Sequence, residues 1–476
     1  MIRHIFKYEW KKGWADRSLI IAGFAIVLLT GISIESGMQW LSFQQTTLQK
    51  INRAEEVQLT TILKDIKKYE SNDSDTTFIK LNSPQHPIIM YASKRGYTSK
   101  PPSVMTGFAI GQSDLYPYYR LFTGIEDQLL LVEDEIQNPM NLLIGKLDLA
   151  FVIIYVLPLI VIALGFNLMS GEREAGTFKL VRNQGIRPRK YLLFKLFFRF
   201  LWIFGIFIIF TILYTALRFP QILNISGIVL LAKILGLTAL YILFWHSLVF
   251  LVNAYGKNSE VNGLVLVGCW VFYLFLLPSI IGTMAEISFP VPSRNLQILE
   301  ERNHNISIDS EEALRDYLNR FPELVPKSLE KDSIQLIDWY PGFLAMQDSI
   351  FQLDGQYKNQ VWDQLIGQQE WVKKAAFLSP AIMMRLSLDF ISKNDLFHFS
   401  TYQKKHDEYI VKWRKYLGKY IFRQKKLAAT DLEDLPRWSF DYQPDSNIFI
   451  GIYAIILTVM SLVCGLGANL KLNKND

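Results

Sequence analysis

Apolar residues are clustered along this chain into six long runs. Residues 149–169 and 261–283 contain no charged side chain, and 448–468 form a third such run. A helix of about 20 residues crosses a hydrocarbon core of about 30 Å. The pattern therefore predicts an integral membrane protein with six spans, at residues 18–38, 149–169, 198–217, 234–253, 261–283 and 448–468.

Basic residues flank these runs and predict their orientation. Lys and Arg gather in residues 1–17, in the segment 170–195 and in the tail 469–476. Short loops rich in Lys and Arg stay in the cytoplasm, so we expect both termini and 170–195 there. The first apolar run lacks a small-x-small cleavage site, which favours a retained span over a cleaved signal peptide. The flanks also explain the net charge of +6, and no nucleic-acid partner is predicted.

The predicted fold class is an all-α integral membrane protein with two large, mainly helical extracytoplasmic segments. Its parts in order are a cytoplasmic amphipathic helix (1–17), a span (18–38), an extracytoplasmic segment (39–147), a second span (148–169), a cytoplasmic basic segment (170–195), three spans within 196–283, an extracytoplasmic helical domain (284–447), the last span (448–468) and a cytoplasmic tail (469–476).

Helical periodicity runs through both extracytoplasmic segments. Apolar residues recur three and four apart, with charges between them, in 48–70, 126–143, 352–378 and 402–427. We favour a folded domain with a core built on the tryptophans Trp339, Trp362, Trp371, Trp413 and Trp438. Helices on the membrane surface are the alternative, because 411–426 is strongly basic. The apolar stretch 225–233 is too short to span and is interpreted as a re-entrant or interfacial lead-in to the fourth span.

Motifs of catalytic and nucleotide-binding sites are missing from the sequence. It has no Gly-x-x-x-x-Gly-Lys-Ser/Thr loop, no His-Glu-x-x-His helix and no Gly-x-Ser-x-Gly elbow. His398 and His406 are eight residues apart with no cysteine nearby, so no metal site is predicted. Cys269 and Cys464 lie inside apolar runs and are expected to be buried free thiols. We therefore predict neither a catalytic residue nor a cofactor in this chain.

Among the polar residues inside the predicted spans, the candidates for a functional role are Asn167, His246, Asn253 and Asn262. The asparagines lie near the cytoplasmic ends, where solvation makes them tolerable, but His246 lies deeper. We interpret His246 as a helix–helix or oligomer contact, with the lining of a transport pathway as the alternative. Pro158 and Pro278 lie within the second and fifth spans and predict kinks.

The segment 170–195 carries seven bases and two acids between two apolar runs. A helix starting near Ser170 would place Glu172 and Glu174 in its first turn, where the helix dipole favours acids. Gly185 and Pro188 are expected to stop that helix. The segment is then a short rigid lever between two spans, or, in the simpler reading, only a loop that sets topology.

Two patterns in this segment resemble the permease subunits of ABC-2 type ABC transporters. They are Glu-x-Glu-x-Gly-Thr-x-x-Leu from Glu172 and Arg-x-Arg-Lys-x-x-x-x-Lys from Arg187. More narrowly, residues 109–119, 135–180 and 378–390 resemble the DUF3526-type permeases of bacteria. The sequence LVRNQGIRP at 180–188 is more polar than the usual family pattern.

This resemblance implies a subunit of an ATP-driven exporter in the bacterial cytoplasmic membrane. It implies that the ATPase-coupling residues are Glu172, Glu174, Gly176, Thr177, Arg187, Pro188, Lys190 and Lys195. ATP and Mg²⁺ would bind a separate cytoplasmic ATPase, with two ATPase chains serving two permease chains, either copies or paralogues. Further expected partners are membrane lipids and an extracytoplasmic protein. Charge reversal across Arg187, Arg189 and Lys190 is expected to abolish ATPase binding.

Two other functions remain open at this point. The first is an ATP-coupled assembly or mechanotransmission subunit, which acts on an extracytoplasmic protein without moving a solute. The second is a membrane enzyme, which a cluster of perturbed titratable groups in the outer domain would favour.

Overall fold

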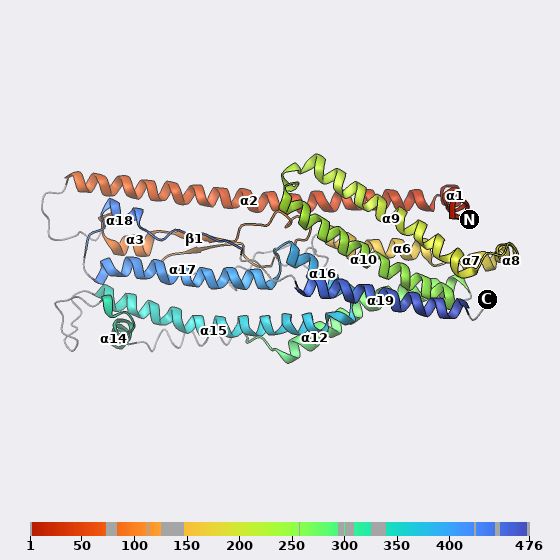
Figure 1. Cartoon of the computed structure of the whole chain (residues 1–476). Coiled ribbons are helices and arrows are strands. Elements are labelled where there is room, and N and C mark those ends of the chain that lie inside the picture. The colour runs from red at the N-terminus through yellow and green to blue at the C-terminus, as the bar shows by residue number, and fades with distance from the viewer. Residues whose placement is uncertain are drawn as a thin grey trace.

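The computed structural model describes residues 2–72, 83–111, 113, 115–124, 147–256, 258–293, 299, 309–324, 339–422, 425–442 and 448–473. These residues form an elongated molecule built almost entirely from helices (Figure 1). One half is a bundle of apolar helices. The other half is a folded domain with its own core, and the first of the long helices runs through both halves.

In the described residues, six helices are long and apolar enough to cross a membrane, and these apolar helices indicate a membrane-embedded protein. Each predicted span falls within one of them. They are α2 (Ser18–Asn72), the helix formed by α5 (Leu149–Phe151), η1 (Val152–Val156), α6 (Leu157–Gly165) and α7 (Ser170–Glu174), then α9 (Pro188–Arg218), α10 (Ile225–Tyr255), the helix formed by α11 (Ser259–Val271), η3 (Phe272–Leu276) and α12 (Leu277–Ser288), and α19 (Ile448–Asn473).

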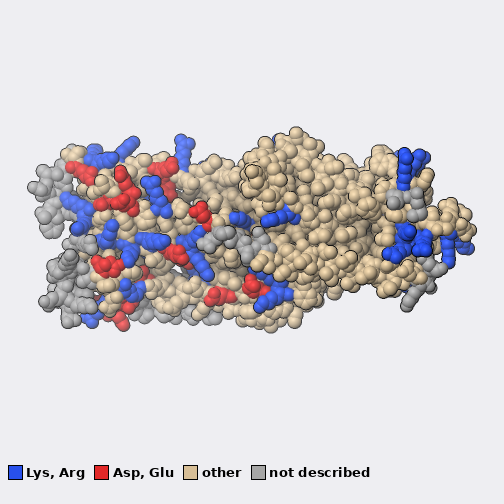
Figure 2. All heavy atoms as spheres, in the orientation of Figure 1, with Lys and Arg blue, Asp and Glu red and all other residues tan. Residues whose placement is uncertain are grey.

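Charged side chains avoid the middle of this bundle. Figure 2 shows Lys, Arg, Asp and Glu gathered over the folded domain and Lys and Arg at the opposite tip, with an uncharged band between them. Both chain termini and the short helices α7 and α8 (Thr177–Asn183) lie at that tip (Figure 1). The structure thus places the three short basic segments at one end of the bundle. Their cytoplasmic location stays a prediction.

Helix α10 is the centre of the bundle, where it packs against α6, α9 and α19. Its aromatic side chains Tyr241 and Trp245 are fully buried. The outer helices turn apolar side chains outward instead, as Ile209 does with 67% of its surface exposed. Such exposed apolar faces are favourable against lipid and unfavourable against water. The amphipathic helix α1 (Ile2–Ala15) packs against α9 and α2.

Both prolines predicted to kink their spans follow a π-helical turn. Pro158 comes two residues after η1, and Pro278 comes two residues after η3. A proline cannot donate a backbone hydrogen bond, and its ring crowds the preceding turn. Widening that turn to a π-helix accommodates the ring without ending the helix.

The domain outside the bundle packs helices around a small antiparallel sheet. The strands β1 (Gly96–Ser99) and β2 (Tyr119–Phe122) pair with Gly96 opposite Phe122. Trp413 and Leu417 are fully buried at the centre of the core. The helices are the outer half of α2, α3 (Pro87–Ser93), α14 (Ser310–Arg320), α15 (Trp339–Ala375), α17 (Leu396–Phe422) and α18 (Ala429–Glu433), with a 3₁₀ turn at η4 (Pro322–Leu324). The helix α16 (Pro380–Ile391) and the turn η5 (Ala376–Leu378) pack against the bundle, and η2 (Pro220–Ile222) connects α9 to α10.

Several sequence interpretations change with the structure. The stretch 225–233 is not a re-entrant segment, because it forms the first turns of the continuous helix α10. Residues 411–422 of the basic stretch 411–426 belong to α17, whose apolar face is buried in the domain core, so this part is no membrane-surface helix. The small sheet was not predicted, because its strands are only four residues each. The predicted helix 126–143 lies outside the described residues.

Candidate functional site

The segment after the second span forms two short helices rather than the single one expected. Helix α7 ends at Glu174, and Gly176 then adopts a φ of +74° before α8 begins. A left-handed backbone is readily available only to glycine, which explains why Gly176 stands at the break. Gly185, with a φ of +68°, ends α8 as predicted, and Pro188 is the first residue of α9. The result is a compact element projecting between two spans.

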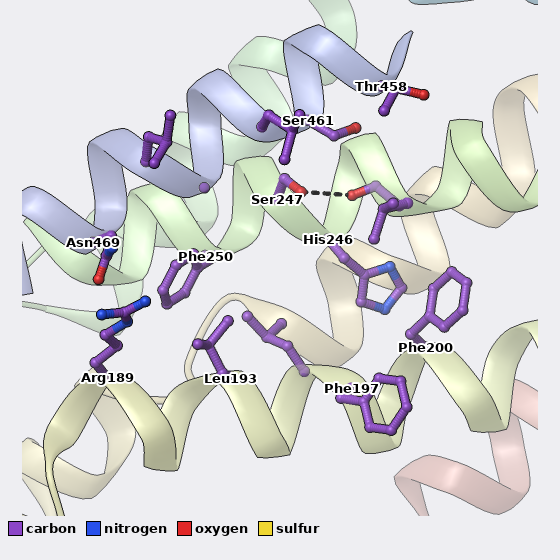
Figure 3. A pocket seen from close by; sticks show the side chains of 15 residues that line it. Arg189, Leu193, Phe197, Phe200, His246, Ser247, Phe250, Thr458, Ser461 and Asn469 are labelled. Carbon is purple, nitrogen blue, oxygen red and sulfur yellow. Dashed lines mark hydrogen bonds between the residues drawn. The ribbon is translucent and has the colours of Figure 1, made fainter. Parts of the chain in front are cut away.

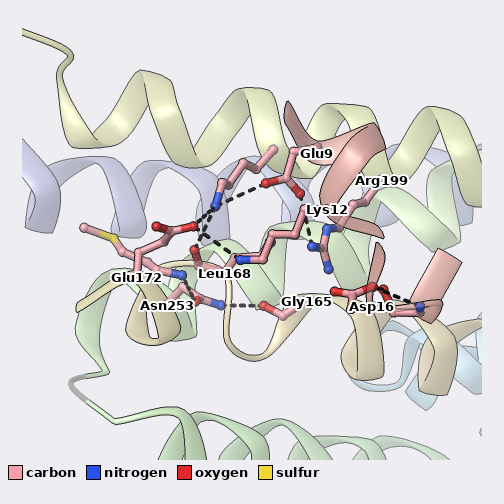
Figure 4. A network of polar contacts seen from close by, with 11 residues as sticks. Glu9, Lys12, Asp16, Gly165, Leu168, Glu172, Arg199 and Asn253 are labelled. Carbon is pink, nitrogen blue, oxygen red and sulfur yellow. Dashed lines mark hydrogen bonds and ion pairs between the residues drawn. The ribbon is translucent and has the colours of Figure 1, made fainter. Parts of the chain in front are cut away.

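The base of this element is a network of buried charges (Figure 4). Glu172 accepts a hydrogen bond from Lys195 of α9 at 2.9 Å. The Lys195 ammonium also lies 3.2 Å from the carboxylate of Glu9 in α1, and Arg199 pairs with that carboxylate at 3.1 Å. Lys12 reaches Glu172 from the surface at 3.4 Å.

Burial makes this network a joint rather than a surface for another protein. The Glu9, Glu172 and Lys195 side chains are each at most 5% exposed. A buried charge without a partner is strongly destabilising, so α1, α7 and α9 must keep their relative positions. Of the eight predicted coupling residues, Glu172 and Lys195 therefore hold the element on the bundle, and Thr177 supports them by donating to the Glu172 carboxylate.

Glu174 ties the element to a different helix. Its carboxylate accepts hydrogen bonds from the backbone N–H of Ser259 at 2.6 Å and from the Ser259 hydroxyl at 2.8 Å. The sequence predicts Glu174 in the first turn of its own helix, but it is the last residue of α7. It interacts instead with the first turn of α11, where free N–H groups favour an acid. Arg173 adds a hydrogen bond to the Gly256 carbonyl at 3.0 Å.

Two of the asparagines predicted inside the spans hold the break between α6 and α7. Asn253 donates to the Gly165 carbonyl at 3.0 Å and accepts from the Met169 N–H at 3.1 Å. Asn262 donates to the Phe166 carbonyl at 3.2 Å. These bonds satisfy backbone groups that a helix end leaves free inside the bundle. The asparagines thus position the candidate coupling element.

The outward face of the element is basic with one apolar residue. Arg187 and Lys190 are exposed, and so is Lys179 on α8. Leu180 lies beside Lys179 and exposes 62% of its surface. A single exposed leucine is ordinary on a protein surface, so what distinguishes this face is its exposed bases. The predicted residues Arg187 and Lys190 lie on this face, whereas Leu180 was not singled out from the sequence.

His246 lines a groove between α9, α10 and α19 (Figure 3). The groove has a volume of about 500 Å³, and its wall is mostly apolar, with Leu193, Phe197 and Leu466 among its side chains. The His246 ring is buried, and its Nδ1 lies 2.9 Å from the Ile242 carbonyl of its own helix. That carbonyl accepts, so Nδ1 carries the proton. The role of His246 in a transport pathway or an oligomer contact stays a prediction.

Titratable groups also gather where the outer domain meets the bundle. Burial raises the pKa of Asp389 to about 7, although Arg385 lies 3.0 Å from its carboxylate. Burial likewise lowers the pKa of Lys100 to about 7. The Lys100 ammonium donates to the Lys393 carbonyl at 2.8 Å and lies 4.4 Å from the centre of the Phe399 ring. The Lys100 contacts join the end of β1 to the loop after α16 and to α17, whereas Arg385 and Asp389 lie on the same helix. Among the described residues, no group of His, Cys, Asp and Glu could hold a metal ion.

The outer domain matches a known family model. Residues 295–441 match a family model described as "Domain of unknown function (DUF3526)". The match lies in the outer domain and contains the stretch 378–390, one of the three that carried the narrower resemblance. No curated protein matches the chain. The description of this family names no activity, so the function is proposed from the geometry of the structure.

Proposed function

We propose that this chain is the membrane-spanning permease subunit of an ABC-2 type ATP-driven exporter in a bacterial cytoplasmic membrane. The observation that carries the proposal is the compact α7–α8 element, which is held on the bundle tip by the buried Glu9–Lys195–Glu172 network. A separate ATPase that binds and hydrolyses ATP with Mg²⁺ would press on the exposed face of this element. The network would transmit the motion to α1 and α9.

Rigid connections make such transmission physically reasonable. Glu174 joins the element to α11, and Asn253 joins it to α10. A displacement of α7 therefore acts on four helices at once rather than on a flexible loop. The two spans that contain π-helical turns would be the ones to rearrange, since their widened turns are weaker than regular helix. Two permease chains with two ATPase chains complete the proposed assembly.

A test of this proposal uses charge reversal on the exposed face. The variant Arg187→Glu with Lys190→Glu should lose the ATPase subunit, and its ATP hydrolysis, when the tagged chain is purified from its native membrane. The control is Arg53→Glu with Lys67→Glu, because these exposed bases lie on the outer half of α2. A P-loop subunit identified by mass spectrometry should remain with the control. Equal retention by both variants would refute the docking face.

Mechanotransmission without solute transport is the second candidate function. It is favoured by α2, which continues unbroken for 55 residues from the bundle tip into the outer domain. A helix of that length extends for about 80 Å. Such a rod can carry motion from an ATPase to an extracytoplasmic protein partner. Reconstituted vesicles that hydrolyse ATP but accumulate no solute would favour this candidate.

A further inference from the structure

The groove beside His246 is polar at one end and apolar along the rest of its length. Figure 3 shows Arg189 and Asn469 near one another at one end, with His246 and Phe200 farther along. Arg189 and Phe200 are eleven residues apart on α9, which corresponds to about 16 Å along the helix. The hydrocarbon core of a bilayer is about 30 Å thick, so the groove extends through about one leaflet.

Arg189 is a cation without a counter-charge in the described part of the chain, where it forms no ion pair. It is the second residue of α9, so the backbone N–H groups of this first turn also lack helical partners. Both features favour an anion at this end of the groove. The side chain points into the groove, unlike the exposed Arg187 and Lys190 beside it.

The remaining length of the groove suits a hydrocarbon chain. Its wall is open toward the outside of the bundle, because Phe197 exposes 52% of its surface and Leu462 exposes 59%. A volume of about 500 Å³ is within the range of sites that enclose small organic ligands. An occupant with an anionic head and an apolar tail would satisfy both parts of the groove.

We propose that this groove binds an anionic phospholipid, with the phosphate at Arg189 and one acyl chain running toward His246. The lipid comes from the leaflet on the side of the α7–α8 element. This inference is independent of the proposed exporter function, since it rests on the groove alone. A bound phosphate would fix the first turn of α9, which directly follows the candidate coupling element. Lipid composition would then influence the position of that element.

A second copy of the chain is the competing occupant. An apolar helix from another copy would cover the groove but would leave the Arg189 guanidinium buried without an anion. Burial of an unpaired charge is strongly unfavourable. The lipid is therefore the occupant that the charge distribution favours, and the same experiment reports on both.

Native mass spectrometry of the detergent-solubilised full chain tests this inference. Phosphatidylglycerol and phosphatidylcholine with identical acyl chains are titrated, and bound copies are counted. The wild type should retain phosphatidylglycerol preferentially. Arg189→Gln should weaken that binding by at least about tenfold, whereas Arg187→Gln should leave it unchanged.

Filling the groove gives an independent second variant. A side chain at Gly465, which lines the groove, meets no other atom within 4 Å at its Cβ, so Gly465→Leu should fold. It should lose bound lipid, while Gly451→Leu on the same helix, which also has free space at Cβ, should keep it. Equal lipid retention by the members of either pair would overturn the proposal. So would a dimer mass in the wild type that Gly465→Leu converts to monomer, or displacement of the lipid by inorganic phosphate.

Discussion

Glu172 and Glu174 are two residues apart on the same short helix, yet their carboxylates have different surroundings. Glu172 is enclosed by Lys195 and Thr177, and Glu174 is exposed and bonded to Ser259. The sequence shows two equivalent acids here. The packing of α1 and α9 against α7 is what buries Glu172 and leaves Glu174 exposed at the surface.

Neutralising the buried acid should therefore destabilise the protein more than neutralising the exposed one. Glu172→Gln leaves Lys195 with Glu9 as its only carboxylate in the network, and we expect a loss of about 2–3 kcal/mol of unfolding free energy. Glu174→Gln is the matched control and should lower the Tm less. Thermal unfolding in detergent, followed by tryptophan fluorescence, measures both. Equal Tm values for the two variants would show that the network is not a structural joint.

Asp389 predicts a pH dependence of stability. Burial raises its pKa in the folded protein to about 7, above the value of about 3.9 in an unfolded chain. The folded state therefore holds a proton that the unfolded state has released between these pH values. Wild-type stability should fall relative to Asp389→Asn as pH rises from about 4 to about 7, by at most about 1.4 kcal/mol per pH unit. Parallel Tm profiles for the two proteins would contradict this result.

The π-helical turn before Pro158 is stabilised by neighbouring helices. Pro158 has no N–H, so the Ile154 carbonyl cannot receive its usual helical bond. The buried Tyr241 hydroxyl of α10 donates to that carbonyl at 3.0 Å. Trp270 of α11 donates to the next carbonyl, that of Tyr155, at 3.2 Å. The π-helical turn of the second span is therefore hydrogen-bonded to two other spans.

A double-mutant cycle tests the hydrogen bond from Tyr241. Tyr241→Phe should be destabilising by about 1 kcal/mol, and less so when Pro158→Ala supplies an N–H for the Ile154 carbonyl, which gives a coupling energy of about 0.5–1 kcal/mol. Tyr453→Phe is the control, because that hydroxyl donates to the Lys373 carbonyl at 2.9 Å, far from Pro158 in sequence. Its effect should be additive with Pro158→Ala. Additivity for Tyr241→Phe as well would contradict the assigned role.

Elements with long-range apolar patterns were predictable from the sequence, whereas those set by contacts between distant residues were not. Residues 402–427 read as a helix because the apolar period recurs over seven turns, and α17 confirms this for 402–422, whereas 425–427 are not helical. The break at Gly176 was missed because an isolated glycine within a polar helix pattern does not fix its own φ. The groove beside His246 needs α19 to pack against α9 and α10, which lie far from it in sequence, so no local pattern could reveal it.

At the scale of the whole molecule, α2 connects the two halves. Its first half packs in the bundle against α9, and Ile66 near its end is buried in the domain core. More than half of its length of about 80 Å extends beyond a hydrocarbon core of about 30 Å. The outer half of α2 therefore lies in the outer domain, and the α7–α8 element lies at the opposite end of the molecule.

Cysteine labelling tests on which side of the membrane each end lies. The two native cysteines, Cys269 and Cys464, are first replaced by serine. Arg53→Cys, on the outer half of α2, should react with an impermeant maleimide in intact spheroplasts. Lys179→Cys, on α8, should react only after permeabilisation, because bases favour the cytoplasmic side. Labelling in the reverse order would place the basic tip outside. The exposed face of α7–α8 would then be out of reach of any enzyme that depends on cytoplasmic ATP, and the exporter and mechanotransmission proposals would fall together.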